Sequence, residues 1–154
     1  CGVRTTLKWP NDLLFGGIKC AGILCEVKSS GATSRVVVGI GINVNRPIGV
    51  PDQLAVAAAW LSDAAGCDVN RTSLLEKLLT AYEQSFDDLL REPGEMIARW
   101  AEASGIRGTR VSVKAHDGSV MHEGEVRGLS DDGALMLLTS SGDVRVLLGD
   151  VSAI

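Results

Sequence analysis

Two apolar segments joined by Gly16-Gly17 constrain the fold of this chain more than any other feature. Residues 13–15 and 18–27 are dominated by Leu, Ile and Val. Both central residues of a tight hairpin turn need positive φ, which glycine adopts without strain. The pattern therefore predicts a β-hairpin near the start of the chain.

Further strands are expected on both sides of this hairpin. Val3–Lys8 predicts a strand that ends at the Trp9–Asp12 break, because proline fixes φ and Asn and Asp favour turns. Lys28–Ser34 is polar and predicts a loop. Val36–Asn43 is a β-branched run that contains glycines, which predicts a central strand that another group approaches closely.

Helical periodicity dominates the middle of the chain. Pro51–Ala65 is rich in alanine and predicts a helix. A second helix is expected to start near Ser73, because Ser73 and Glu76 have the spacing of a capping box. Pro93-Gly94 is expected to end it, and a short helix is expected near Glu95–Ala103. The apolar face of the second helix is expected to consist of Leu75, Leu78, Leu79, Tyr82, Phe86, Leu89 and Leu90.

The pattern changes at Ser104-Gly105. Arg110–Ala115 alternates between apolar and polar residues, as a half-buried strand does. Turn dipeptides then separate short strands expected near Val120–Leu129, Ala134–Thr139 and Val144–Leu148. Several short strands in one region predict a small β-barrel, so we place a domain boundary near residue 105.

Composition narrows the class of function. Hydrophobic residues make up 45% of the chain and charged residues 22%, as in folded globular proteins. The formal net charge is −4 without a run of Lys and Arg, which argues against a general nucleic-acid binder. No apolar run reaches the roughly 18 residues needed to cross a membrane, so no membrane partner is expected.

Cysteine, histidine and tryptophan show no pattern of a metal site. The chain has 4 cysteines, and no pair has the C-x-x-C spacing of zinc ligands. Cys20 and Cys25 lie in an apolar stretch, so we expect small buried side chains in a reducing cytoplasm; a reactive thiol or a disulfide is the alternative. We expect Trp9 to be a packing residue, Trp60 and Trp100 to pack against helices, and His116 and His122 to lie at the surface.

Three motifs follow one another in the first third of the chain. Lys8–Asp12 reads K-W-P-N-D, Gly17–Leu24 reads G-I-K-C-A-G-I-L, and Gly39–Asn43 reads G-I-G-I-N. In this order and at this spacing the motifs resemble the biotin protein ligase family. The resemblance continues more loosely through the helical segment and into the C-terminal strands, so it covers essentially the whole chain.

The resemblance implies an α+β fold and an ATP-dependent ligase. Residues 1–104 would be the C-terminal portion of a catalytic domain like that of the class II aminoacyl-tRNA synthetases, and residues 105–154 would form an SH3-like β-barrel. Biotin and MgATP would give biotinyl-5′-AMP and pyrophosphate. A lysine in the biotin carboxyl carrier domain of an acyl-CoA carboxylase would then receive the biotin. We expect the protein to be cytoplasmic and to have no nucleic-acid partner. A homodimer is one option for its oligomeric state.

Lys19 is the candidate catalytic and biotin-binding residue. Attack of the biotin carboxylate on the α-phosphorus of ATP brings two anions together, so a fixed cation must bridge them. Lys19 follows the Gly16-Gly17 turn and begins an apolar strand, which gives its ammonium a rigid support. In the family the lysine of this motif contacts both biotin and the phosphate, and Lys19 matches it. Without the surrounding motif, a hairpin lysine would be expected in solvent.

Three glycines are further candidates for biotin binding. Without a side chain, Gly22, Gly39 and Gly41 would let a flat ligand ring approach the backbone. A β-bulge or tight packing of the sheet would account for the same glycines without a ligand.

Four polar residues are candidates for the ATP side. Asn43 carries an amide that suits the edge of adenine, and the resemblance implies a nucleotide contact there; capping a turn is the alternative. The loop with Asn11 and Asp12 is implied to line the ATP side. Asp12 could orient Lys19 or a Mg²⁺ ion bound to the phosphates, or it could only stabilise the turn. Lys8 is the candidate for a second cation that faces the phosphates.

The family also has an upstream loop rich in glycine and arginine that folds over biotin and the adenylate, and no G-R-G-R run occurs here. The chain starts at Cys1 and not at Met, so we expect further residues upstream. These 154 residues alone are therefore expected to be weakly active or inactive. No helix-turn-helix precedes the motifs, so the sequence offers no ground for repressor activity.

Two other functions are left open. A lipoate ligase or transferase would share the fold and use a lysine similarly, although the Lys8–Asp12 run and the C-terminal strands favour biotin. A non-catalytic binding module is the second alternative, because small barrels serve many functions. That alternative predicts that no ligand site lies near Lys19.

Overall fold

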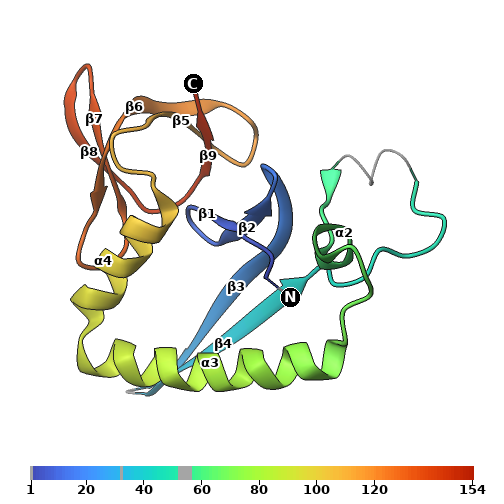
Figure 1. Cartoon of the computed structure of the whole chain (residues 1–154). Helices are drawn as coiled ribbons and strands as arrows, with labels where there is room; N and C mark the ends of the chain where they lie inside the picture. Colours follow the sequence, from blue (N-terminus) through green and yellow to red (C-terminus); the bar gives the residue numbers. More distant parts are fainter. Residues whose placement is uncertain (1, 32, 52–56) are drawn as a thin grey trace. The chain divides into compact units, whose positions relative to one another are not determined.

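The computed structural model describes residues 2–31, 33–51 and 57–154 (Figure 1). Close contacts divide the chain into two compact units. Unit 1 consists of Cys1–Leu7 and Asn11–Arg71, and unit 2 consists of Lys8–Pro10 and Thr72–Ile154. Both β-sheets are built from antiparallel pairs, and helices separate them along the chain, so the α+β class is confirmed.

The first sheet has the strand order β1-β2-β3-β4. The predicted Gly-Gly hairpin is confirmed, because Phe15 pairs with Ile18 across Gly16 and Gly17, whose φ angles are 57° and 82°. β4 lies at the edge of the described sheet, so its prediction as a central strand is wrong. The strands are Thr6–Lys8 (β1), Asp12–Phe15 (β2), Ile18–Ser30 (β3) and Thr33–Ile42 (β4).

The loop predicted at Lys28–Ser34 is mostly strand. The β3–β4 ladder continues through the pairs Lys28–Arg35, Ser29–Ser34 and Ser30–Thr33. The hydroxyl oxygens of Ser29 and Ser34 lie 2.9 Å apart across the ladder. Polar residues fit this part of the hairpin because both of its faces are exposed to solvent.

The helix predicted at Pro51–Ala65 is not continuous over the residues that the structure describes. The helix α2 spans Leu61–Ala65 and ends at Gly66, which has a φ of 68°. Residues 58–60 are not helical, and residues 52–56 lie outside the described part of the chain. The N–H of Ala59 donates instead to the carbonyl of Lys19, so a tertiary hydrogen bond overrides the helical propensity of alanine.

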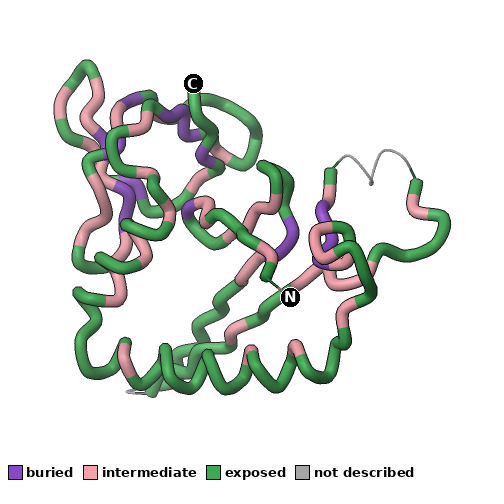
Figure 2. Tube along the Cα trace, in the orientation of Figure 1, coloured by how far each residue is buried: buried purple, intermediate pink, exposed green. Residues whose placement is uncertain are grey.

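Two longer helices follow, with boundaries that differ from the predictions. α3 spans Arg71–Arg91, so it begins two residues before Ser73 and the predicted capping box is wrong. Pro93 is the first residue of α4, Pro93–Ser104. At this position the missing N–H of proline removes no hydrogen bond from the helix. The predicted apolar face of α3 includes exposed side chains, and Figure 2 shows no buried residue along this helix.

The second sheet has the strand order β8-β7-β6-β5-β9. Its core contains buried side chains from several strands, and Trp9 joins them. Buried positions along the backbone of this sheet are purple in Figure 2. The described residues show no ladder between the edge strands β8 and β9, so closure into a barrel stays a prediction, as does a domain boundary at residue 105. The strands are Arg110–Lys114 (β5), Val120–Leu129 (β6), Leu135–Thr139 (β7), Gly142–Val146 (β8) and Asp150–Ala153 (β9).

None of the described helices has the combination of length and apolar character that a membrane span requires. α3 has the necessary length, but charged side chains interrupt its apolar residues. The expectation that the protein has no membrane partner was drawn from the sequence, and it stays a prediction.

Candidate functional site

A hollow of about 830 Å³ lies against strands β3 and β4 in unit 1. Its floor is apolar, with Ile23, Ile40 and Ile42 among the lining residues. Six of the residues predicted from the sequence line it together, although they come from three separate motifs. They are Asn11, Lys19, Gly22, Gly39, Gly41 and Asn43.

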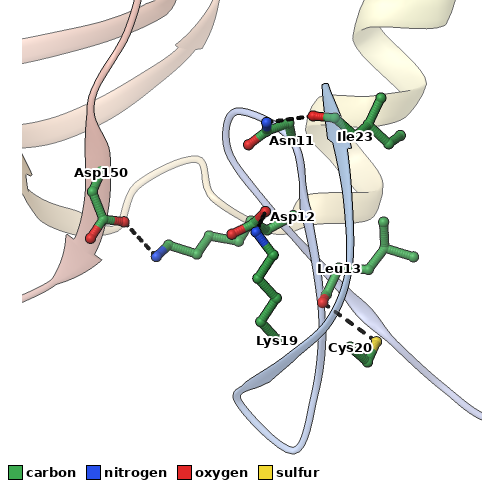
Figure 3. Close-up of polar contacts among 8 residues, drawn as sticks. Asn11, Asp12, Leu13, Lys19, Cys20, Ile23 and Asp150 are labelled. Carbon is green, nitrogen blue, oxygen red and sulfur yellow. Dashed lines mark hydrogen bonds and ion pairs between the residues drawn. The ribbon is translucent and has the colours of Figure 1, made fainter. Parts of the chain in front are cut away.

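Lys19 carries the positive charge of the hollow. Its ammonium nitrogen lies 2.6 Å from Oδ1 of Asp12 (Figure 3). The Lys19 side chain is 54% exposed, whereas that of Asp12 is 19% exposed. Oδ1 of Asp12 is buried and forms no hydrogen bond within the described part of the chain, so the neighbouring ammonium offsets its charge. Lys19 therefore stands at the border of the hollow with its charge reachable by a ligand.

Gly22 makes room for this ion pair. A Cβ atom at Gly22 would lie 2.9 Å from Cε and 3.0 Å from Nζ of Lys19, and 3.1 Å from Oδ1 of Asp12. The predicted role of Gly22, access of a ligand ring to the backbone, stays a prediction. The space beside this glycine is occupied by the ends of the two charged side chains.

Gly39 and Gly41 lie on β4 and leave its surface open. The nearest atoms to a Cβ at these positions would be the carbonyl oxygens of Leu24 at 3.6 Å and of Gly22 at 3.9 Å. Both distances are ordinary contacts, so the packing of the sheet itself does not require glycine here. The absence of side chains at these two positions widens the hollow.

Asn11 ties the start of β2 to β3. Its side-chain amide donates to the carbonyl of Ile23 at 2.5 Å, and its own carbonyl accepts the N–H of Ile23 at 2.9 Å (Figure 3). The adjacent Asp12 pairs with Gly22 in the ladder. These bonds bring Asn11 to the hollow and Asp12 to Lys19, so two adjacent residues serve different parts of the site.

Asn43 lies just beyond the end of β4. Its N–H donates to the carbonyl of Cys20 at 2.8 Å, and its carbonyl accepts the N–H of Leu61 at 3.0 Å. Both backbone groups are therefore used by the fold, and the side chain belongs to the lining of the hollow. A nucleotide contact for this amide stays a prediction.

Cys20 lies behind Lys19 as a structural residue. It is 1% exposed, its Sγ donates to the carbonyl of Leu13 at 3.4 Å, and burial raises the pKa of its thiol (Figure 3). Its expected burial is confirmed. The same expectation for Cys25 is wrong, because β3 is exposed to solvent beyond Leu24.

The first three residues of the K-W-P-N-D run belong to unit 2. The ammonium of Lys8 lies 2.6 Å from Asp150 on β9, and Lys8 does not line the hollow. Trp9 is 4% exposed in the core of unit 2, where its indole N–H donates to the carbonyl of Gly133 at 3.1 Å. The expected packing role of Trp9 is confirmed, and a phosphate contact for Lys8 stays a prediction.

Arg46 and Asp63 belong to no motif and could not be singled out from the sequence. The guanidinium of Arg46 lies 4.5 Å from the centre of the Trp60 ring, and its Nε donates to both carboxylate oxygens of Asp63 at 3.0 and 3.1 Å. The hydrogen bond between the two side chains raises the pKa of Arg46 and lowers that of Asp63. Their separation along the chain hides this pairing from any local pattern.

A metal cage is not present among the described residues. They contain no group of three or more His, Cys, Asp or Glu side chains that could hold a metal ion. His116 is exposed and His122 is half-buried. Asp12 does not line the hollow itself, and its carboxylate is paired with Lys19.

Two family models match this chain, one at each end. The Biotin/lipoate A/B protein ligase family matches residues 2–43, which include Lys19 and the glycines of β3 and β4. The Biotin protein ligase C terminal domain matches residues 108–153, which form the second sheet. The chain belongs to the biotin protein ligase family.

Individual relatives of this ligase family align with nearly the whole chain. The bifunctional ligase/repressor BirA of Bacillus subtilis is 35% identical over 97% of this chain and 46% of its own length. The biotin--[acetyl-CoA-carboxylase] ligase of Mycobacterium tuberculosis is 33% identical over 96% of this chain and 53% of its own length. The chain thus spans about half the length of these relatives.

A solved structure supports the same fold. The biotin protein ligase from Aquifex aeolicus in complex with biotin and ATP superposes with a TM-score of 0.78 at 27% identity. The match covers 99% of this chain and 62% of that protein. The apo structure of the same Aquifex ligase gives a TM-score of 0.79.

Proposed function

We propose that the protein uses ATP to attach biotin to a lysine of a carrier domain in an acyl-CoA carboxylase. Membership of the biotin protein ligase family supports biotin as the substrate. The Aquifex relative in complex with biotin and ATP supports the pair of ligands. The single observation that carries the proposal is the position of Lys19 at a hollow lined by glycines and two asparagines.

In the first step, an oxygen of the biotin carboxylate attacks the α-phosphorus of ATP. The bond from the α-phosphorus to the bridging oxygen breaks, and pyrophosphate leaves. Negative charge on the carboxylate and the phosphate would repel without a cation between them. The ammonium of Lys19 supplies that charge at the border of the hollow and lowers the barrier by positioning and electrostatic stabilisation.

In the second step, the neutral amine of the carrier lysine attacks the acyl carbon of biotinyl-5′-AMP. The bond from this carbon to the phosphate oxygen breaks, AMP leaves, and the new amide loses a proton. The adenylate thus stores the free energy that amide formation needs. Asp12 would keep Lys19 in place until the substrate anions approach, because it pairs with the same ammonium.

The other site residues have simpler roles in this proposal. The open backbone at Gly39 and Gly41 would admit the flat rings of biotin, and Asn43 and Asn11 would line the nucleotide side. Lys8 would be a second cation near the phosphates only if it left Asp150. Magnesium would arrive with ATP, bound to its phosphates.

The finer features implied by family membership are part of the proposal. They are a catalytic domain related to the class II aminoacyl-tRNA synthetases and an SH3-like barrel at the C-terminus. The proposal also includes a cytoplasmic location and, as one option, a homodimer. The B. subtilis relative is a ligase/repressor, so the absence of a nucleic-acid partner stays a prediction for this protein.

Substitution of Lys19 tests the proposed function. We expect Lys19→Ala in the full-length protein to lower biotin-dependent exchange of pyrophosphate into ATP by about a hundredfold to a thousandfold, because a preorganised charge at the reacting phosphate is lost. Lys28→Ala is the matched control, since Lys28 is an exposed lysine on the same strand. Equal exchange rates in the two variants would refute the role of Lys19.

Calorimetry separates biotin from lipoate as the ligand. The family model that matches residues 2–43 includes both kinds of ligase, so this comparison is needed. We expect the full-length protein to bind biotin and not lipoate, and Lys19→Ala to weaken biotin binding. Preference for lipoate would replace biotin in the proposal. Unchanged biotin affinity in Lys19→Ala would instead favour a binding module without this catalytic lysine.

A further inference from the structure

One short segment holds the backbones of both Lys19 and Asn43. We call residues 59–62 the bridge. The N–H of Ala59 donates to the carbonyl of Lys19 at 2.9 Å, and the N–H of Leu61 donates to the carbonyl of Asn43 at 3.0 Å. Ala59 and Leu61 are 7% and 9% exposed, so water competes little for these bonds.

These bonds matter because the sheet does not provide them. The last pair of the β3–β4 ladder joins Ala21 to Ile42, so Lys19 and Asn43 both lie beyond its end. Lys19 still pairs with Leu14 of β2, and the N–H of Asn43 donates to the carbonyl of Cys20 at 2.8 Å, so the bridge adds to contacts that the sheet supplies. The bridge therefore supplies a second link between the backbones of Lys19 and Asn43, beside the hydrogen bond from Asn43 to Cys20.

Arg46 fixes the bridge by three contacts. Its guanidinium lies over the Trp60 ring at 4.5 Å, and its Nε donates to the Asp63 carboxylate at 3.0 and 3.1 Å. Its backbone N–H donates to the hydroxyl of Ser62 at 3.0 Å. Arg46 thus contacts residues on both sides of Leu61, the residue that binds Asn43. We call Arg46, Trp60 and Asp63 the clamp.

We propose that the clamp residues are positioning residues for the ligase reaction. This inference rests on the proposed function. None of the three side chains lines the hollow, so they would act on the reaction only through the bridge. A displacement of about 1 Å at reacting groups can cost a hundredfold in rate, so a loosened bridge should lower activity without a direct contact to substrate.

The geometry also explains why arginine serves here. A planar guanidinium can stack on an indole face and present a fork of N–H groups to a carboxylate at the same time. A lysine keeps the charge but offers a single point of contact. Arg46→Lys should therefore retain part of the function of the clamp, whereas Arg46→Gln should lose both the charge and the fork.

Two measurements on the full-length protein test this proposal. The first is the rate of amide hydrogen exchange at Ala59 and Leu61 without ligands, and the second is kcat/KM for ATP in pyrophosphate exchange. We expect Arg46→Gln to speed the amide exchange and to lower kcat/KM, each by about tenfold, with a smaller effect in Arg46→Lys. Arg91→Gln is the matched control, because the Arg91 side chain is 73% exposed and its guanidinium lies 3.6 Å from Asp88 on the same helix. This variant should change neither quantity.

The outcomes separate this proposal from the proposed function. If Arg46→Gln leaves the amide exchange unchanged, or if its kcat/KM equals that of Arg91→Gln, the clamp is not a positioning device. If Arg46→Gln does not fold, the same comparison is made with Arg46→Lys. If the unmodified protein makes no biotinyl adenylate, the proposed function fails first, and the positioning role fails with it whatever the amide exchange shows.

Discussion

Gly22 lies where the side chains of Lys19 and Asp12 meet, and this meeting defines the site at the scale of single residues. A buried carboxylate oxygen is costly unless a charge compensates it, so Asp12 draws the ammonium of Lys19 toward the sheet. The glycine leaves the necessary space. Lys19 carries the positive charge of the hollow, and Asp12 and Gly22 determine where its ammonium lies.

Gly22→Ala tests this arrangement. The added Cβ would lie 2.9 Å from Cε of Lys19, and because that atom belongs to the flexible end of a side chain, the protein should still fold. The ammonium should move away from its place, and kcat/KM for ATP should fall by about tenfold. Steady-state pyrophosphate exchange gives this value.

Gly94→Ala serves as the control for Gly22→Ala. Gly94 lies in the first turn of α4 and needs no positive φ, and a Cβ added to it would have no atom within 4 Å. Alanine there should leave kcat/KM unchanged and should not lower stability. A Gly22→Ala variant with the activity of Gly94→Ala would show that the Lys19–Asp12 pair does not need the glycine.

At the scale of elements, the sequence predicted the turns and strands that depend on neighbouring residues alone. The Gly16-Gly17 turn and the strand Val120–Leu129 were predicted with the observed bounds, because turn chemistry and alternation are properties of neighbouring residues. The non-helical residues 58–60 were missed. Hydrogen bonds from this part of the chain go to Lys19 and Asn43, and no alanine-rich pattern contains that information.

Some residues of the candidate site could likewise be predicted from the sequence, and others could not. Motif residues such as Lys19 and Asn43 could be named from the sequence because their order and spacing resemble a family. The pairing of Arg46 with Asp63 could not be predicted, because the two residues are far apart along the chain and share no local pattern. Nor could the partner of Lys8 be predicted, since Asp150 lies near the other end of the chain.

At the scale of the whole molecule, one motif contributes to both compact units. Lys8–Pro10 belongs to unit 2, while Asn11 and Asp12, the next two residues, belong to unit 1. Trp9 is 4% exposed and belongs to the cluster of buried side chains that forms the unit 2 core. A motif near the start of the chain is therefore needed to complete the core of the C-terminal sheet.

Trp9→Ala should destabilise unit 2 strongly. Loss of a buried tryptophan costs about 3–5 kcal/mol in typical cores, and the hydrogen bond to the carbonyl of Gly133 is lost as well. Urea unfolding followed by circular dichroism would measure the loss. Trp9→Phe keeps most of the packing and should cost less. A midpoint for Trp9→Ala equal to that of the unmodified protein would contradict the role of Trp9 in this core.

A crystal structure of the full-length protein with biotin and a non-hydrolysable ATP analogue would test the role of Lys19 without relying on any variant. We expect both ligands in the hollow at β3 and β4, with the Lys19 ammonium within hydrogen-bond distance of the biotin carboxylate and the α-phosphate. Ligands bound elsewhere, or a Lys19 that touches neither of them and stays with Asp12, would contradict this expectation.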